Sequence, residues 1–237
     1  MNTNKRTARV AGFLYLLVIV FGMFALMYVR PSLIVPGDTA ATAKNIVDSE
    51  SLFRLGVVSE LIMYTCFLLL PLPLYVLLKP VHKNLALLMV ILVFVSVPMG
   101  MLNTLNDFAA LTLLSGADYL TVFTTGQLQA QMMFFLNLHE NGYLIAQIFF
   151  GAWLLPLGYL VFKSSYFPRI LGVLLILGGL AQLTDTFTSL LFPGYESIVL
   201  TVLGVFSFSE ILFCLWLLIM GAKGQPEDSP AFELSKI

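Results

Sequence analysis

Seven polar residues lie within or beside long apolar runs of this chain and could do chemistry there. They are Glu60, Asn103, Asp107, His139, Gln147, Asp185 and Glu210. Ionisable side chains inside a membrane-spanning helix cost roughly 2.5–3.5 kcal/mol each on insertion scales, so they are expected to face the protein interior or water. Turned inward together, these groups would form a polar pocket in the outer half of a helix bundle, which binds a small molecule, a lipid or a cation.

Spacing along the chain places several of these residues on common helix faces. Side chains three or four residues apart lie on the same face of an α-helix. Asn103 and Asp107 are separated by one such step, and His139 and Gln147 are separated by two. Each pair is therefore predicted to project from one side of its helix.

Glu60 and Glu210 each follow a serine within an apolar run. No lysine or arginine lies deep in these runs, and the nearest candidate partner of Glu60 along the chain is Arg54. An unpaired carboxylate is costly in an apolar environment. We therefore expect both side chains to face the interior, in one polar cluster that includes Asp185 or Asn103.

Two other interpretations of the same residues remain open. His139 and Glu140, together with Asp107 and Asp185, could serve a membrane-embedded enzyme as a general base or as metal ligands. A single histidine is a weak basis for zinc, whose catalytic sites usually use more than one, so neither a metal nor another cofactor is expected. Alternatively, the polar groups only fix helix packing in a structural or regulatory membrane subunit.

The composition indicates a membrane protein. Hydrophobic residues make up 59% of the 237 residues and charged residues only 11%, whereas soluble domains carry about 25% charged residues. A formal net charge of −1 excludes the basic surface that nucleic-acid binding requires. Two cysteines, both in apolar runs, exclude a disulfide scaffold. The expected partners are the lipid bilayer and a small-molecule or lipid ligand, and the oligomeric state stays open.

Apolar runs that are long enough to cross a bilayer recur along the chain. A membrane-spanning helix needs about 20 consecutive, mainly apolar residues. The predicted spans are residues 10–29, 55–78, 85–105, 143–162, 170–190 and 198–220. The third span could reach residue 114, and the path of residues 106–141 is ambiguous because glycines and polar residues interrupt the pattern. The predicted fold class is an all-α polytopic membrane helix bundle with about six transmembrane helices.

Residues 30–54 form the longest polar segment between the predicted spans. Asp38 is a favourable N-cap, and the alanine-rich residues after it favour a helix. We expect a short surface helix to begin there, in the first external loop. Ile46 and Val47 would face the bilayer and Lys44 would face water.

Basic residues are distributed unevenly between the two sides of the predicted spans. Of the 12 Lys and Arg residues, only Arg30, Lys44 and Arg54 lie in loops opposite to the termini. Cytoplasmic loops carry an excess of Lys and Arg, so both termini are expected in the cytoplasm and the protein in the plasma membrane. Residues 1–222 are then a single transmembrane helix-bundle domain, and residues 223–237 are a polar cytoplasmic tail.

Four stretches of the chain resemble a known family when they are taken together. They are RVAGFLYLLVIVFGMFA at 9–25, SLIVPGDTAATAKNI at 32–46, ESLFRLGVVSELI at 50–62 and IFFGAWLLPLGYLVFKSSYFPRILGVLLILGGLAQL at 148–183. The set resembles the bacterial and archaeal membrane proteins that carry the domain of unknown function 4386. This resemblance covers nearly the whole chain and implies a single membrane domain of the six-helix class. It implies no activity, so it transfers no site residue.

Overall fold

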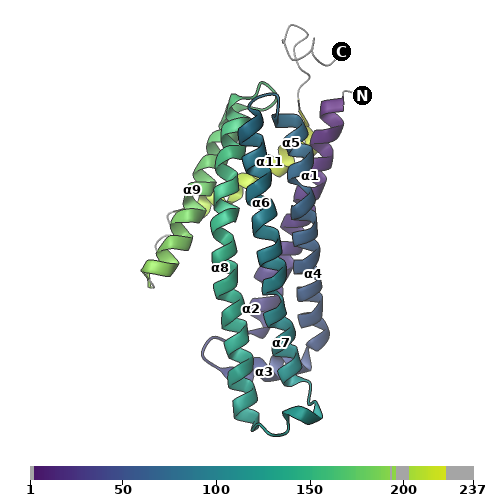
Figure 1. The fold of residues 1–237 in the computed structure, drawn as a ribbon, viewed down its shortest axis with the longest axis vertical. Coiled ribbons are helices and arrows are strands. Elements are labelled where there is room, and N and C mark those ends of the chain that lie inside the picture. The colour runs from purple at the N-terminus through teal and green to yellow at the C-terminus, as the bar shows by residue number, and fades with distance from the viewer. Residues whose placement is uncertain (1–2, 193, 196–202, 223–237) are drawn as a thin grey trace. The chain divides into compact units, whose positions relative to one another are not determined.

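Helices make up the regular structure of this protein. The computed structural model describes residues 3–192, 194–195 and 203–222, and these residues contain no β-strand, which confirms the all-α prediction. In chain order the elements are α1 (Thr3–Gly22), the π-helix η1 (Met23–Val29), α2 (Arg30–Leu33), α3 (Thr39–Asp48), α4 (Glu50–Leu69), α5 (Pro71–Leu78), α6 (Lys83–Asn103), α7 (Leu105–Leu114), the 3₁₀-helix η2 (Asp118–Leu120), α8 (Thr125–Lys163), α9 (Arg169–Leu191), the 3₁₀-helix η3 (Gly204–Ser207) and α11 (Phe208–Ile219). Figure 1 shows these elements along the chain.

Five helical stretches of the described chain are long and apolar enough to cross a membrane. They are Thr3–Leu33, Glu50–Leu78, Lys83–Leu114, Thr125–Lys163 and Arg169–Leu191. The sixth predicted span, residues 198–220, lies partly outside the described residues, and its described part contains the shorter apolar helix Gly204–Ile219. The sixth crossing therefore stays a prediction.

The helix α8 begins much earlier than the predicted fourth span. That span was expected to start at residue 143, whereas α8 is 39 residues long and starts at Thr125. A capping box explains the early start, because the N–H of Thr124 donates to Oε1 of Gln127 at 2.9 Å and the N–H of Gln127 donates to Oγ1 of Thr124 at 3.3 Å. The ambiguous segment before residue 141 therefore forms α7, η2 and the first part of α8.

The first helical stretch continues past its predicted end at Val29. Pro31 would disrupt a regular α-helix, because its ring lacks an N–H and clashes with the preceding turn. In η1 the bonding pattern is wider, and the N–H of Arg30 donates to the carbonyl of Ala25, five residues earlier. Since α2 then extends the helix to Leu33, Arg30 lies within helical structure and not in the loop where it was expected.

The short helix predicted after Asp38 is present as α3. Its N-cap is Asp38, whose side chain accepts a hydrogen bond from the N–H of Ala41 at 2.8 Å. The predicted orientation is wrong for Ile46, which is fully buried in a hydrophobic cluster with Val29 and Phe53. Protein atoms thus cover a side chain that was expected to meet lipid, and a position of α3 at the membrane surface stays a prediction.

The described chain divides into two compact units. Unit 1 contains the described residues of Met1–Leu16, Cys66–Ser96 and Gln147–Ile237, and unit 2 contains Leu17–Thr65 and Val97–Ala146. Each unit brings together helical segments that are distant in the sequence. Each can therefore build a site from several helices.

Aromatic side chains fill the centre of unit 1. The ring centroid of Trp153 lies 6.0 Å from that of Tyr15 and 5.2 Å from that of Phe67. The helices α8 and α9 also approach closely in this unit, because a Cβ atom on Gly172 would lie 2.5 Å from the carbonyl oxygen of Gly158. Small residues permit such close packing between membrane helices.

A mainly aliphatic cluster fills unit 2. Its buried members are Val29, Leu33, Ala43, Ile46, Phe53, Val57, Ala110, Leu111, Leu113, Leu120, Met132 and Leu136. They come from η1, α2, α3, α4, α7, η2 and the first part of α8. This cluster holds in place the elements that carry the polar residues of unit 2.

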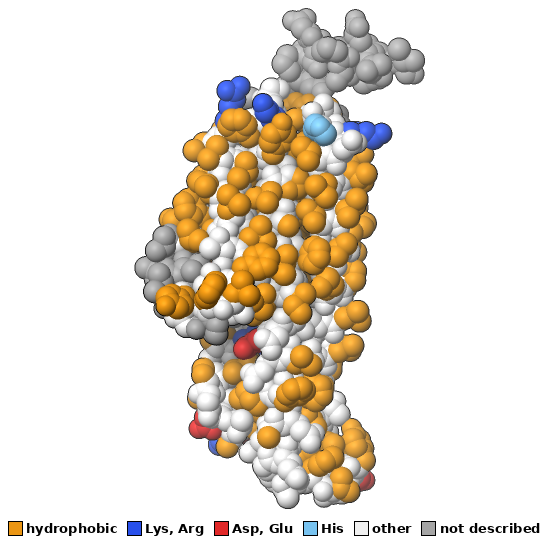
Figure 2. Space-filling view, turned by 60° about the vertical axis from the view of Figure 1, so that its left-hand side comes forward, with side chains coloured by type: hydrophobic (Ala, Val, Ile, Leu, Met, Phe, Trp, Pro, Cys, Tyr) orange, Lys and Arg blue, Asp and Glu red, His pale blue; other side chains and the backbone are white. Residues whose placement is uncertain are grey.

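Large hydrophobic side chains remain exposed along the membrane-length helices. Phe13, Leu102, Phe134 and Ile170 are each more than half exposed. Figure 2 shows hydrophobic side chains spread over the visible face. Apolar surface on this scale suits contact with lipid rather than with water.

The described basic residues of unit 1 gather at one end. The start of α1, the α5–α6 turn and the α8–α9 turn lie at the same end of this unit (Figure 1). These segments and the helix ends beside them carry Lys5, Arg6, Arg9, Lys79, Lys83, Lys163 and Arg169. The charge asymmetry of the sequence is therefore also an asymmetry in space within unit 1.

Candidate functional site

Four ionisable side chains from different elements lie together in unit 2 and are called the ionic cluster below. Arg30 comes from α2, Glu60 from α4, Asp107 from α7 and His139 from α8. Glu60 is 2% exposed, and Asp107 and His139 are each 1% exposed. Ionisable residues are almost never buried to this extent without a partner. The contacts among the four side chains therefore determine what the cluster can do.

Asp107 lies between a guanidinium and an imidazole in the ionic cluster. Nη1 of Arg30 donates to Oδ1 of Asp107 at 3.0 Å. The other carboxylate oxygen, Oδ2, lies 3.3 Å from Nε2 of His139. The same Nε2 atom lies 3.2 Å from Oε1 of Glu60. One imidazole nitrogen thus faces two carboxylates.

The hydrogen bonding of the ionic cluster is incomplete. Three buried atoms of the ionic cluster have no hydrogen-bond partner among the described residues: Nη2 of Arg30, Oδ2 of Asp107 and Nδ1 of His139. Buried polar atoms in native proteins usually have at least one partner, and an unsatisfied one marks a functional site, a bound water or an ion. The contact between Asp107 and His139 is therefore close without being a hydrogen bond.

Asn103 supports His139 through the backbone. Its Nδ2 atom donates to the carbonyl oxygen of His139 at 2.8 Å. Asn106 in turn donates to Oδ1 of Asn103 at 3.0 Å. The position of the Asn103 side chain requires glycine at position 142, because a Cβ atom there would lie 2.0 Å from Oδ1 of Asn103. Asn103 thus helps to position His139 and does not itself touch the carboxylates in any described contact.

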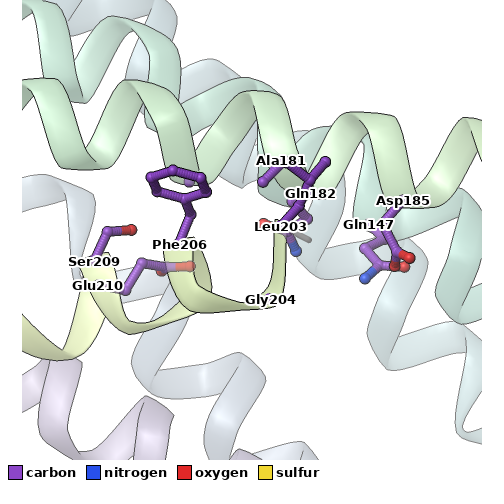
Figure 3. Close-up of a pocket in the computed structure, with 10 residues that line it drawn as sticks. Gln147, Ala181, Gln182, Asp185, Leu203, Gly204, Phe206, Ser209 and Glu210 are labelled. Carbon is purple, nitrogen blue, oxygen red and sulfur yellow. The ribbon is translucent and has the colours of Figure 1, made fainter. Parts of the chain in front are cut away.

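Unit 1 contains a polar pocket with a cavity volume of about 140 Å³. Its lining residues come from α8, α9, η3, α11 and the residue before η3, and they are Gln147, Gly178, Ala181, Gln182, Asp185, Leu203, Gly204, Phe206, Ser209 and Glu210. Figure 3 shows Gln147 and Asp185 at one end of the pocket, Ser209 and Glu210 at the other, and Gln182 between them. Polar groups from three helices therefore surround one cavity.

Glu210 has a neutral partner in unit 1. The hydroxyl of Tyr15 donates to Oε2 of Glu210 in a short hydrogen bond. One turn further along α11, Sγ of Cys214 donates to the carbonyl of Gly12 at 3.4 Å. Both contacts fix α11 against α1, and Tyr15 holds the Glu210 carboxylate at the pocket.

Ser209 adds a hydroxyl to the same pocket. Its side chain is 3% exposed, and its Oγ atom has no hydrogen-bond partner among the described residues. A Cβ atom on Gly178 would lie 2.3 Å from this oxygen, so glycine is needed for α9 to pass so close to α11. The pocket therefore contains a buried hydroxyl with unused hydrogen-bonding capacity.

The structure divides the predicted site residues between the two units. Glu60, Asn103, Asp107 and His139 lie together in unit 2, and Gln147, Asp185 and Glu210 line the pocket of unit 1. Glu60 and Glu210, which were expected in one polar cluster, thus belong to different units and have different described partners. Ligand binding by either group stays a prediction.

Arg30 and Tyr15 are partners that the sequence pattern did not identify. The expected partner of Glu60, Arg54, pairs instead with Glu50 one turn earlier, at 2.7 Å. An Arg-Pro pair at the end of an apolar run indicates a loop, and this hid the helical position of Arg30. The only available signal was an arginine directly after a membrane-length run. Tyr15 carried no signal, because an aromatic residue in an apolar run is usually a packing residue.

Comparison with known proteins identifies relatives of this chain. A family described as "Domain of unknown function (DUF4386)" matches residues 10–221. A protein of Archaeoglobus fulgidus described as "Uncharacterized protein" is 32% identical over 152 residues, which are 63% of this chain and 74% of the relative. No solved structure matches the chain. These findings confirm the family resemblance seen in the sequence.

Proposed function

The chain belongs to the DUF4386 family, and from this premise we propose that it is a multi-pass membrane protein that binds a small organic cation in the pocket of unit 1. The observation that carries this proposal is the pocket lining. It contains the carboxylates of Asp185 and Glu210, and none of its described residues is basic. A cleft that is lined by one sign of charge concentrates ligands of the opposite sign.

The hydrogen-bonding groups of the pocket favour an ammonium ligand. An ammonium group donates three hydrogen bonds and accepts none. The pocket offers carboxylate oxygens of Asp185 and Glu210, amide oxygens of Gln147 and Gln182, and the hydroxyl of Ser209. Glu210 already accepts one bond from Tyr15, but a carboxylate has about four acceptor positions. Acceptors therefore remain for a cationic donor.

The size of the cavity restricts the ligand. The pocket has a volume of about 140 Å³, close to a cavity of roughly 150 Å³ that holds one benzene molecule. A single ring or a short chain with one ammonium group fits this volume. The ammonium could belong to a free amine or to the headgroup of an ethanolamine lipid, since both present the same chemistry.

The test measures binding of benzylammonium to the full-length protein in a maltoside detergent. Wild-type protein should bind benzylammonium and not benzyl alcohol, which has nearly the same shape without the charge. Glu210→Gln and Asp185→Asn should each weaken binding about 10- to 100-fold, because a hydrogen bond to a charged group contributes about 1.5–3 kcal/mol. Asp118→Asn is the matched control, since Asp118 is exposed and belongs to unit 2.

Added phosphatidylethanolamine separates the two sources of the ammonium group. Competition between this lipid and benzylammonium would identify a headgroup as the natural ligand, and an unchanged benzylammonium affinity would identify a free amine. Equal binding of benzyl alcohol, or full binding by the Glu210→Gln variant, would contradict the proposal.

The proposed membrane arrangement has six spans with both termini in the cytoplasm of a plasma-membrane protein. Its support is the basic end of unit 1, since cytoplasmic segments are rich in Lys and Arg. An impermeant maleimide should label Lys44→Cys on intact cells, because Lys44 is exposed on α3. It should label Lys83→Cys, at the exposed first residue of α6, only after permeabilisation. The reverse pattern would invert the topology.

A further inference from the structure

We infer that Glu60, Asp107 and His139 of unit 2 form a binding site for one divalent transition-metal ion of the zinc type. Each residue offers one ligand atom, and the three atoms lie within 4.8 Å of one another. Zinc is bound by imidazole nitrogen and by carboxylate oxygen, and its catalytic sites use three protein ligands with one position left open. The sequence predicted no metal, because the candidate residues include a single histidine.

The two distances from the imidazole nitrogen to the carboxylate oxygens suit a tetrahedral ion. With metal–ligand bonds of about 2.0–2.1 Å, two ligand atoms of a tetrahedral site lie about 3.3–3.4 Å apart. In the ionic cluster, Nε2 of His139 lies 3.2 Å from Oε1 of Glu60 and 3.3 Å from Oδ2 of Asp107. Both separations are close to the tetrahedral value.

A proton on His139 explains the same geometry less well. A single N–H group on Nε2 can point at one carboxylate only, and Oδ2 of Asp107 has no hydrogen-bond partner among the described residues although Asp107 is 1% exposed. Hydrogen bonds between an ionised nitrogen donor and a carboxylate are typically about 2.7–2.9 Å long, which is shorter than either contact. A metal ion would bind both oxygens and the nitrogen together.

Arg30 prepares Asp107 for this role. It donates to Oδ1 of Asp107 at 3.0 Å, which orients the carboxylate and leaves Oδ2 directed at His139. Carboxylate ligands of metal sites are commonly held by such hydrogen bonds. The two carboxylates of Glu60 and Asp107 also exceed the single guanidinium by one negative charge when both are ionised. This excess attracts a cation into the buried cluster.

The experiment titrates Co²⁺, as a spectroscopic substitute for Zn²⁺, into the full-length protein in detergent after treatment with a chelator. We expect one Co²⁺ per chain, the intense visible absorption of tetrahedral coordination, and loss of that absorption when Zn²⁺ is added. Glu60→Gln and His139→Gln should weaken Co²⁺ binding by more than about 100-fold, beyond the 10–100-fold effect of groups that only support a ligand. These variants keep side-chain volume and hydrogen-bonding capacity.

Two control variants have matching chemistry away from the ionic cluster. His82→Gln removes the second histidine, which lies exposed in the α5–α6 turn, and Glu140→Gln removes an exposed carboxylate next to His139. Both should bind Co²⁺ like the wild type. Zn²⁺ should also raise the melting temperature of the wild type and of both controls but not of Glu60→Gln, because a ligand stabilises only a folded state that binds it.

Three results would overturn the inference. The first is folded wild-type protein that binds no Co²⁺ near neutral pH. The second is Co²⁺ binding that survives both Glu60→Gln and His139→Gln. The third is an imidazolium signal from His139 in a nitrogen NMR spectrum recorded with excess Zn²⁺, since a proton would then occupy the atom assigned to the metal. Failure of benzylammonium to bind would contradict only the proposed function of the pocket in unit 1. The metal site is tested separately, by Co²⁺ binding.

Discussion

Glu60 of unit 2 and Glu210 of unit 1 are both carboxylates in apolar surroundings, yet their partners differ. Glu60 faces the imidazole of His139 next to the Arg30–Asp107 ion pair. Glu210 accepts a hydrogen bond from the neutral phenol of Tyr15 and forms no ion pair with any described residue. In unit 2 the carboxylates are therefore balanced mainly by ionisable side chains. In unit 1 the Glu210 carboxylate is balanced by the dipole of the Tyr15 hydroxyl.

The two carboxylates also differ in how far solvent or a ligand can reach them. The three central residues of the ionic cluster are at most 2% exposed, whereas Glu210 is half-buried and lines a cavity. An enclosed carboxylate requires a fixed positive partner, because no solvent can screen it. A carboxylate on a pocket can instead receive its counter-charge from a ligand. The comparison therefore distinguishes the enclosed ionic cluster of unit 2 from the pocket of unit 1, which can take up a molecule.

The largest expected effect comes from removing the fixed charge of unit 2. Arg30→Gln leaves Asp107 buried without its guanidinium, and breaking a buried ion pair in this way costs about 3–5 kcal/mol. Arg54→Gln is the control, because the Arg54–Glu50 pair is exposed on one helix and such pairs contribute about 0.3–0.5 kcal/mol. The losses of the two variants are measured as changes in the free energy of unfolding in mixed micelles. Similar losses in the two variants would show that the ionic cluster is not a buried charge system.

A smaller effect is expected from removing the dipole that supports Glu210. Tyr15→Phe deletes the hydroxyl and leaves a half-buried carboxylate without its donor, at a cost of about 1–3 kcal/mol. Tyr28→Phe is the matched control, since Tyr28 is 59% exposed on η1 and should change stability by less than about 0.5 kcal/mol. Thermal unfolding in detergent distinguishes them. A Tyr15→Phe variant as stable as wild type would mean that the phenol does not balance the charge.

The last comparison concerns the packing that positions His139, and its control variant carries the smallest expected effect. In Gly142→Ala the new methyl group would meet Asn103, and overpacking of this kind costs about 1–3 kcal/mol. In Gly126→Ala, near the start of the same helix, nothing lies within 4 Å of the new Cβ atom. That substitution should stabilise the protein by about 0.5–1 kcal/mol, the usual difference between Gly and Ala in a helix. A Gly142→Ala variant at least as stable as the wild type would show that the Asn103 contact does not depend on close approach.

Much of the fold follows from patterns along the chain, because bilayer-length apolar runs leave a helix as their main solution. The apolar runs predicted the five membrane-length helices, and Asp38 predicted the start of α3. The start of α8 was missed because Gly126 and several polar residues obscured the capping box formed by Thr124 and Gln127. Helix boundaries depend on such local side-chain bonds more than on hydrophobicity.

The site was predictable only in its residue types. Ionisable residues in apolar runs identified Glu60, Asp107, His139 and Glu210 as interior groups, because the cost of lipid exposure applies to each residue separately. Their partners were not predictable, since pairing depends on which helices pack together. The prediction of one shared cluster for Glu60 and Glu210 rested on the serine before each residue and on its position in an apolar run, and neither feature indicates which helices pack together.

The π-helical segment η1 has a consequence for the rotational phase of the first helix. Each residue of an α-helix turns the chain by about 100°, and a π segment accommodates a surplus residue without ending the helix. If all the residues between Met23 and Val29 instead kept the regular α pitch, the surplus residue would turn Arg30 by about 100° around the axis. The guanidinium would then leave Asp107, although every residue that contacts Asp107 was retained. The wider turn of η1 thus sets the direction in which the Arg30 guanidinium points.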